Sequence, residues 1–220
     1  MIRLFHAYPD LLNLYGPGAD LAVLSRYLRG NGAEVRLTPF DRGETPAFPE
    51  GSFVYFGAAT EEKMLLAARA LVPLKEALSR YAERGGLLLF VGASAALPLE
   101  EIETADGRIE KGLGLVPGRA VIDGGRRYSE ICEVCNFCEG DLFGAVNTSL
   151  TLSPQAEEFP GGYRRGTVLA TELCTPVLRN PVLLRRLAEL LLERRPQDPQ
   201  EPWFEHLLRA SEAAKKAMFE

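Results

Sequence analysis

The chain has 220 residues, of which 30 are acidic and 25 are basic, so its formal net charge is −5. Hydrophobic residues make up 46% of it, an ordinary globular balance that excludes wholesale disorder, and the negative charge gives no support to nucleic-acid binding. The two histidines, His6 and His206, lie at opposite ends of the chain, which excludes a two-histidine zinc finger and an H-E-x-x-H metal helix.

The first half of the chain alternates strand-like and helix-like segments. Strands are expected at 3–8, 34–38, 52–56 and 87–91, and helices at 20–30 and 61–84. Thr60 is placed to cap the second helix, and Pro73 is expected to interrupt it. The continuous apolar run 87–91 is typical of a strand covered on both faces. This recurrence of strand, glycine-rich turn and helix predicts an α/β fold with a mostly parallel, doubly wound, flavodoxin-like sheet and flanking helices.

The second half is richer in strands, which are expected at 114–122, 143–151 and 167–170. Asn180 and Pro181 predict a helix start, as capping residue and first-turn proline. Asp198 and Glu201 have the capping-box spacing of a last helix that continues to about Met218. We therefore expect one domain over residues 1–195 and a helical extension over 196–220. The apolar side of that extension packs on its own domain or docks a partner.

The sequence predicts neither a membrane span nor a signal peptide. No segment reaches the ~18 apolar residues of a membrane span, and the first residues lack the basic and apolar regions of a signal peptide. A cytoplasmic location is therefore expected, in which thiols stay reduced.

Three of the four cysteines fall within seven residues, at Cys132, Cys135 and Cys138, and Cys174 follows the strand expected at 167–170. In a loop, this spacing suits thiolate ligation of zinc or of an iron–sulfur cluster. The other interpretation is a set of reduced cysteines, partly buried as small hydrophobic residues. The sequence leaves both open.

The segment 87–97 has the pattern of a nucleophile elbow, in which an apolar strand runs through a sharp turn of small residues into a short helix. Backbone N–H groups at such a helix start can stabilise an anion formed during catalysis. By itself the pattern is also that of an ordinary strand-to-helix turn in a doubly wound sheet.

Taken in order, several segments resemble class I glutamine amidotransferases of the cobyric acid synthase type. The most similar member is the small amidotransferase subunit of lipid II isoglutaminyl synthase. The similarity begins at 6–16 (HAYPDLLNLYG) and continues through the turn at Gly57 and the elbow at Gly92. It then extends over 106–115, 144–149, 166–170 and Asn180-Pro181, and so spans about residues 1–195.

The resemblance implies a cysteine at the elbow and a histidine on a later strand, but these positions are Gly92 and Ala170. Thr148, after Asn147, replaces another family histidine, and Ala58 and Ala59 replace glycines of the segment similar to the oxyanion loop. The remnant of the substrate pocket is then expected at Gly57, Ala58, Ala59, Ala93, Ser94, Asn147 and Thr148. A shift of the alignment by a residue or two does not restore this pair, because no cysteine precedes residue 132 and no histidine lies between His6 and His206.

These departures predict an amidotransferase-like subunit that has lost glutaminase activity. By resemblance, its partner is a Mur-ligase-like ATP-dependent synthetase that amidates peptidoglycan precursors. One alternative is a cysteine-ligated metal or iron–sulfur protein that uses the same fold for binding or sensing. A second is an active glutaminase with rebuilt chemistry, for which a Ser94–His6 pair is conceivable because both lie toward the ligand-binding edge of such a sheet.

Overall fold

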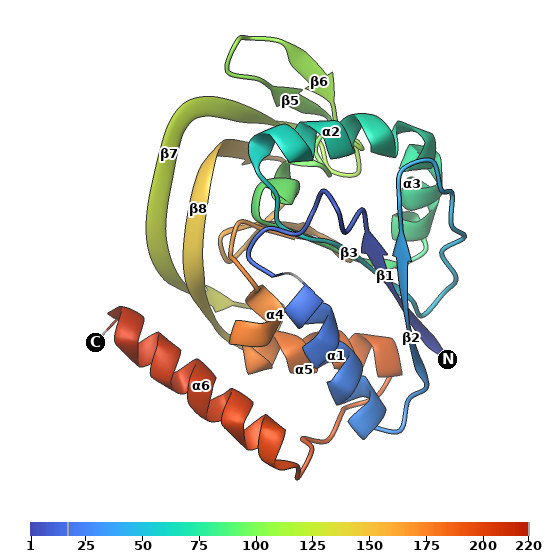
Figure 1. Ribbon diagram of the computed structural model, residues 1–220, viewed down its shortest axis with the longest axis vertical. Coiled ribbons are helices and arrows are strands. Elements are labelled where there is room, and N and C mark those ends of the chain that lie inside the picture. The colour runs from blue at the N-terminus through green and yellow to red at the C-terminus, as the bar shows by residue number, and fades with distance from the viewer. Residues whose placement is uncertain (17, 220) are drawn as a thin grey trace.

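The computed structural model describes residues 1–16 and 18–219 (Figure 1). Its strands are β1 (Ile2–Ala7), β2 (Val35–Phe40), β3 (Phe53–Phe56), β4 (Leu87–Val91), β5 (Glu101–Glu103), β6 (Ile109–Lys111), β7 (Gly118–Cys135), β8 (Gly140–Pro154), β9 (Glu157–Phe159), β10 (Gly162–Arg165) and β11 (Val168–Thr171). Its helices are α1 (Gly18–Gly30), α2 (Glu61–Leu71), α3 (Lys75–Glu83), α4 (Pro176–Arg179), α5 (Pro181–Leu192) and α6 (Pro202–Phe219), with short 3₁₀ helices η1 (Val72–Leu74) and η2 (Gly92–Ala96).

The main sheet has seven strands in the order β2-β1-β3-β4-β11-β10-β9. The five strands from β2 to β11 are parallel, and β10 and β9 extend the sheet in antiparallel fashion. This sheet confirms the predicted α/β, mostly parallel class. Because β2 and β3 lie on opposite sides of β1, the connections separate there, and the carboxyl ends of β1, β3, β4 and β11 face one edge.

Helices cover both faces of this sheet, which explains the continuous apolar sequence of β4. Leu88 and Phe90 belong to the core beneath α2 and α3, whereas Leu87, Leu89 and Val91 belong to the core beneath α1, α4 and α5. Successive strand residues point to opposite faces, so an apolar residue is needed at every position.

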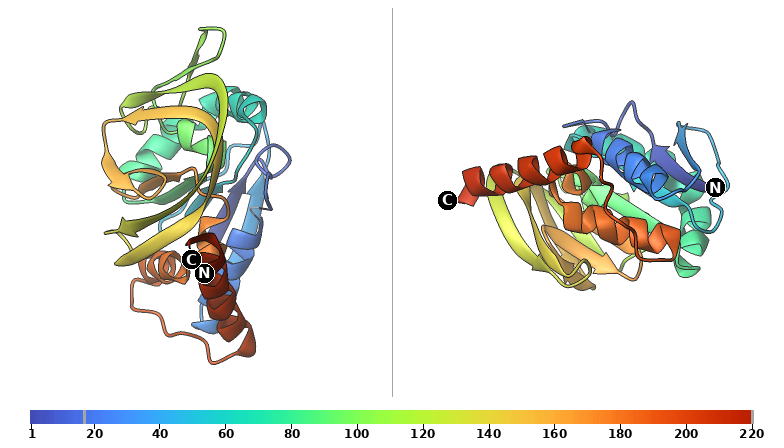
Figure 2. Two further views of the ribbon diagram at one scale, coloured as in Figure 1. Left: turned by 90° about the vertical axis from the view of Figure 1, so that its left-hand side faces the viewer. Right: turned by 90° about the horizontal axis from the view of Figure 1, so that it is seen from below.

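A second sheet, in the order β6-β5-β7-β8, was not expected from the sequence. Its long strands β7 and β8 curve together along one side of the molecule (Figures 1 and 2). Their pairing is interrupted between Ile122 and Arg127, where a β-bulge lets the ribbon bend. The strand expected at 114–122 begins only at Gly118 and continues well beyond its predicted end, and the strand expected at 143–151 extends beyond both of its predicted ends. Tertiary pairing and not local pattern sets the length of both strands.

The helix signals in the first half are confirmed. Thr60 caps α2, since its hydroxyl accepts a hydrogen bond from the backbone N–H of Lys63 at 3.3 Å. The helical segment is interrupted at η1, which contains Pro73, because proline lacks the N–H that an α-helix interior requires.

Two cap predictions in the second half are wrong. Helix α5 begins at Pro181 as expected, but the Asn180 side chain makes no capping hydrogen bond to it. That side chain instead forms hydrogen bonds with the backbone N–H and carbonyl of Phe143 in β8. Helix α6 begins at Pro202, four residues after Asp198, whose carboxylate instead accepts hydrogen bonds from Tyr27 and Arg185. Tertiary partners outcompete the local caps at both positions.

Helix α6 lies on the outside of the domain, and its carboxyl end is on the opposite side of the molecule from the amino terminus (Figure 1). Phe204 in its first turn is buried and packs against Tyr27 of α1 at a ring distance of 5.4 Å. Further along, Lys215 forms an ion pair with Asp141 of β8 at 3.0 Å. The helix is thus attached to its own domain at both ends.

Candidate functional site

The elbow predicted from the sequence is present at the carboxyl end of β4. Gly92 directly follows Val91 and has a φ of +62°, a left-handed conformation that L side chains rarely adopt, and η2 begins at this residue. Ser94, in η2, is fully buried, and its hydroxyl donates a hydrogen bond to the carbonyl of Gly57 at 2.6 Å. The backbone therefore has the strand–turn–helix form of a nucleophile elbow.

The elbow has neither a nucleophile nor the space for one. A β-carbon at Gly92 would lie 2.8 Å from Cβ of Ala58 and 3.2 Å from its Cα, well inside carbon–carbon contact distance. Ala58 is 2% exposed, and its carbonyl accepts a hydrogen bond from Leu14 N–H at 2.8 Å, which holds the loop in place. Ala58 thus fills the space in which a side chain at the elbow would begin.

Several residues assigned to the substrate-pocket remnant do meet at this edge. The loop after β3 contains Gly57, Ala58 and Ala59, and the turn after the elbow contains Ala93 and Ser94. The hydrogen bond from Ser94 to Gly57 connects the two segments. Asn147 and Thr148 come from β8 of the second sheet, whose residue Val146 forms an isolated bridge with Leu173, just after β11. That bridge brings β8 to the carboxyl edge of the main sheet.

Ala170, predicted to stand at the histidine position, lies inside β11. It is fully buried and pairs with Phe90, two residues before the elbow. Thr171 pairs with Val91, so the next residue along, Glu172, is the one level with Gly92. Sequence reasoning missed Glu172, although an acidic residue directly after an apolar parallel strand is the signal that could have found it.

Glu172 is an unusual carboxyl. Burial, together with the negative charges of Asp123 and Glu61, raises its pKa from 4.5 to about 7, although the Thr148 hydroxyl and Arg127 oppose the shift. Its Oε1 is buried with no hydrogen-bond partner among the described residues. A carboxyl with a pKa near neutrality suits proton transfer, but the elbow beside it offers no nucleophile to activate.

Replacing Glu172 by Gln is expected to raise the free energy of unfolding at about pH 8 and leave it unchanged at about pH 4. The folded-state pKa of about 7 exceeds the ordinary 4.5, so the wild type loses stability as the pH rises through this window. The shift corresponds to about 3 kcal/mol in the free energy of unfolding. Urea unfolding at both pH values measures this difference in the free energy of unfolding. The control is Glu62→Gln, which removes an exposed carboxyl from α2. An equal gain at both pH values would contradict the prediction.

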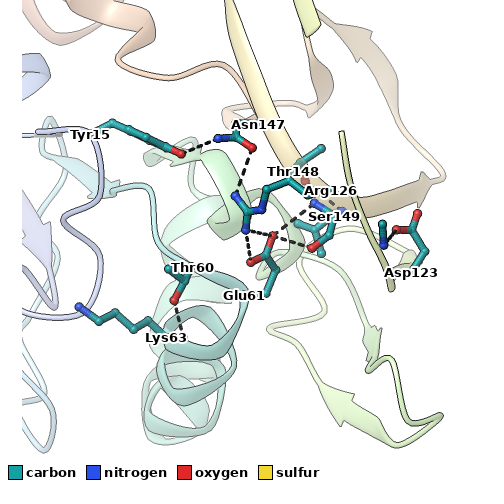
Figure 3. Close-up of polar contacts among 11 residues, drawn as sticks. Tyr15, Thr60, Glu61, Lys63, Asp123, Arg126, Asn147, Thr148 and Ser149 are labelled. Carbon is teal, nitrogen blue, oxygen red and sulfur yellow. Dashed lines mark hydrogen bonds and ion pairs between the residues drawn. The ribbon is translucent and has the colours of Figure 1, made fainter. Parts of the chain in front are cut away.

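A polar network joins four side chains, those of Tyr15, Glu61, Arg126 and Asn147 (Figure 3). The Arg126 guanidinium donates to both oxygens of Glu61, at 3.1 and 2.8 Å, and to the Asn147 side-chain oxygen at 3.2 Å. The Asn147 amide donates in turn to the Tyr15 hydroxyl at 2.9 Å. The network joins the loop after β1, the start of α2 and both strands of the β7–β8 ribbon.

Glu61 is the centre of this network. Its Oε1 also accepts hydrogen bonds from the hydroxyl of Ser149, at 2.7 Å, and from its backbone N–H, at 3.2 Å. Burial alone would raise the pKa of the Glu61 carboxyl, but these bonds and Arg126 hold it below its usual value. Glu61 is therefore a charged structural anchor at a helix start, where the helix dipole favours an anion.

The second possible catalytic pair, Ser94 with His6, does not form. The Ser94 hydroxyl is committed to Gly57, and His6 Nε2 is buried without a hydrogen-bond partner among the described residues. The His6 ring packs edge-on against Tyr55 at 5.8 Å, and desolvation lowers its pKa, although a backbone hydrogen bond to Leu12 opposes this. His6 is thus a partly buried packing residue of β1.

The four cysteines are not brought together. Cys132 is exposed on β7, Cys135 and Cys138 are buried, Cys174 is partly buried, and all four are free thiols. Within residues 1–16 and 18–219, no group of three or more His, Cys, Asp or Glu side chains is arranged to hold a metal ion. The segment around the first three forms a strand and a tight turn and not a wrapping loop. The zinc or iron–sulfur site therefore stays a prediction without support from the geometry.

The site consists of a strand–turn–helix elbow at the carboxyl edge of the sheet and the neighbouring loop after β3. No protein-family model matches the chain, and no curated protein matches it. Among solved structures it is similar to one described as a crystal structure of glutamine amidotransferase. The two are 16% identical, the match covers 85% of this chain and 98% of the other, and the TM-score is 0.54. The chain thus has a glutamine amidotransferase-like fold.

In the described part of the chain, no helix combines the length and the apolar character needed to cross a bilayer.

Proposed function

We propose that the protein is a glutamine amidotransferase-like subunit without glutaminase activity, which acts as a non-catalytic partner of an ATP-dependent amide synthetase. The observation that carries this proposal is the elbow, where Gly92 keeps the strained backbone of a nucleophile position and Ala58 fills the space of the missing side chain. The solved neighbour is described as a glutamine amidotransferase, which supports the general class.

Glutamine hydrolysis by this type of fold needs a nucleophile to attack the amide carbon and a base to move the proton. Gly92 has no side chain, and Ala170 lies inside the sheet with no group that can carry a proton. The carboxyl of Glu172 could accept a proton, but a base without a nucleophile does not form the covalent intermediate.

The proposed partner is a Mur-ligase-like synthetase of the lipid II isoglutaminyl synthase type, which amidates a cell-wall precursor. The support is the resemblance of segment 6–16 to the start of that enzyme's amidotransferase subunit. This segment runs from the end of β1 to the polar network, where Tyr15 is 46% exposed. In such a complex the protein acts as a scaffold or regulator, and the synthetase takes its nitrogen from free ammonia.

The test is to co-express the chain with a Mur-ligase-like synthetase, purify the complex and measure ammonia release from glutamine. We expect a stable complex that releases no ammonia above the buffer background, and amide synthesis that proceeds when an ammonium salt is added. A cysteine-containing glutamine amidotransferase assayed in parallel shows that the method detects hydrolysis. Ammonia release from the purified complex would overturn the loss of activity, and failure of the two chains to associate would overturn the choice of partner.

A further inference from the structure

Cys135 and Cys138 lie side by side at the end of the β7–β8 ribbon. Cys135 is the last residue of β7, where it pairs with Gly140 of β8, and Cys138 lies in the turn between them. The Cys138 thiol is hydrogen-bonded to the Cys135 sulfur. The two side chains are 1% and 8% exposed and belong to the core beneath α5. Two thiols in such contact, at a C-x-x-C spacing, are the arrangement that forms a dithiol couple.

Two cation–π contacts order the turn that contains the two thiols. Phe137, between them, has the guanidinium of Arg164 on its ring at 5.4 Å and that of Arg186 at 5.2 Å. It also packs edge-on against Phe159 at 6.1 Å. These contacts order the turn and place two positive charges near the sulfurs, which favours a thiolate.

The pKa values of the two thiols are shifted in opposite directions. The hydrogen bond from Cys138, followed by backbone hydrogen bonds and the charge of Arg164, lowers the pKa of Cys135 to about 7, although its burial opposes this. The pKa of Cys138 is raised, because its thiol donates that bond and is itself buried. One of the two thiols is therefore ionised near neutral pH and the other retains its proton.

A cavity of about 380 Å³ leads to this pair. It is lined by Cys138, Glu139, Val182, Arg185, Arg186, Glu189, Arg195 and Pro196. Arg185 is paired with Asp198 and Arg186 with Glu189, whereas Arg195 is exposed and forms no ion pair within the described residues. Among the described residues, the two ion pairs leave Arg195 and Glu139 as the unpaired charges of the cavity, and Arg195 is the group that a small anionic molecule can contact.

We propose that Cys135 and Cys138 are a redox-active dithiol, which an anionic low-molecular-weight disulfide oxidises to an intramolecular disulfide through the arginine-lined cavity. The Cys135 thiolate takes the Cys138 proton while the Cys138 sulfur attacks the small disulfide, which forms a mixed disulfide and releases one thiolate. Cys135 then gives its proton to that thiolate and attacks the Cys138 sulfur, which releases the second small thiolate. The protein loses two electrons and the single proton of the pair, and the small disulfide becomes one thiol and one thiolate, which takes its proton from water. This inference is independent of the proposed synthetase partner.

The test uses the full chain carrying Cys132→Ser, so that the exposed thiol on the same ribbon cannot react. After reduction, the protein is treated with oxidised glutathione and digested without reductant, and mass spectrometry locates the bonds. We expect a Cys135–Cys138 disulfide, which a return to excess reduced glutathione opens again. Adding Cys135→Ser should stop the reaction at a mixed disulfide on Cys138, whereas adding Cys138→Ser should prevent both products.

Two further measurements separate this site from ordinary thiol oxidation. Replacing Arg195 by Gln should slow the reaction with oxidised glutathione severalfold and leave the reaction with neutral 2-hydroxyethyl disulfide unchanged. Circular dichroism checks that each cysteine variant is folded, and the Cys132→Ser parent tests the proposal even where a second substitution prevents folding. The proposal is overturned if that folded parent forms no Cys135–Cys138 bond, or if glutathione remains attached at Cys174 alone.

Discussion

Replacing Gly92 by Ala is expected to lower the free energy of unfolding by about 2–4 kcal/mol. About 1–2 kcal/mol comes from the φ of +62°, which an L residue adopts only with strain. The remainder comes from overpacking, because the new methyl group would lie 2.8 Å from Cβ of Ala58. Ala58 cannot easily withdraw, since its carbonyl is bonded to Leu14 N–H and its Cα is also within 3.2 Å.

Urea unfolding of a double-mutant cycle measures the two parts separately. In an Ala58→Gly background, Gly92→Ala should lower the free energy of unfolding mainly by the strain of the positive φ, because the opposing methyl group is gone. Gly43→Ala is the matched control, since Gly43 has a φ of +87° and nothing within 4 Å of the added carbon. Equal costs for Gly92→Ala and Gly43→Ala would show that Ala58 does not fill the elbow.

Replacing Asn180 by Ala is expected to lower the free energy of unfolding by about 2–5 kcal/mol, because it leaves the buried N–H and carbonyl of Phe143 without their side-chain partner. Asn180 is 1% exposed, and its side-chain oxygen accepts from Phe143 N–H at 2.9 Å. Its amide donates to the carbonyls of Phe143, at 3.1 Å, and Pro176, at 2.9 Å. One side chain thus joins β8 of the second sheet to the α4–α5 junction.

Asn31 provides the comparison for this prediction. It also makes three hydrogen bonds, two from its amide to the carbonyls of Tyr27 and Gln197 and one to its oxygen from Gln197 N–H. These bonds lie nearer the surface, where water can take over, so Asn31→Ala should cost only about 1 kcal/mol. Thermal or urea unfolding compares the two variants. Similar losses at the two positions would mean that burial of the Asn180 bonds contributes little.

Local sequence signals predicted the parallel part of the molecule well. The apolar run 87–91, the cap at Thr60 and the break at Pro73 each depend on interactions within a few residues, and the structure has all three. The small residues at 92–96 likewise indicated the elbow, because a sharp turn between strand and helix restricts the residues it accepts.

The candidate site was harder to predict, because long-range contacts build it. Arg126 and Glu61 are far apart in sequence and meet only because the β7–β8 ribbon bends over the sheet edge. Ala170 was placed at the site from resemblance, yet strand register puts Glu172 level with the elbow. Asn180 carries the local signature of a helix cap, but its side chain bonds to β8 instead.

By itself, the sequence determined that no cysteine precedes residue 132 and that no histidine lies between His6 and His206. Composition and order suffice for that conclusion, because a missing side chain cannot be restored by folding. Only the tertiary structure decided that Ala58 closes the elbow, that Glu172 stands beside it with a raised pKa, and that Cys135 and Cys138 share a proton. Each of these depends on distances between segments that the chain brings together only when its sheets and helices pack.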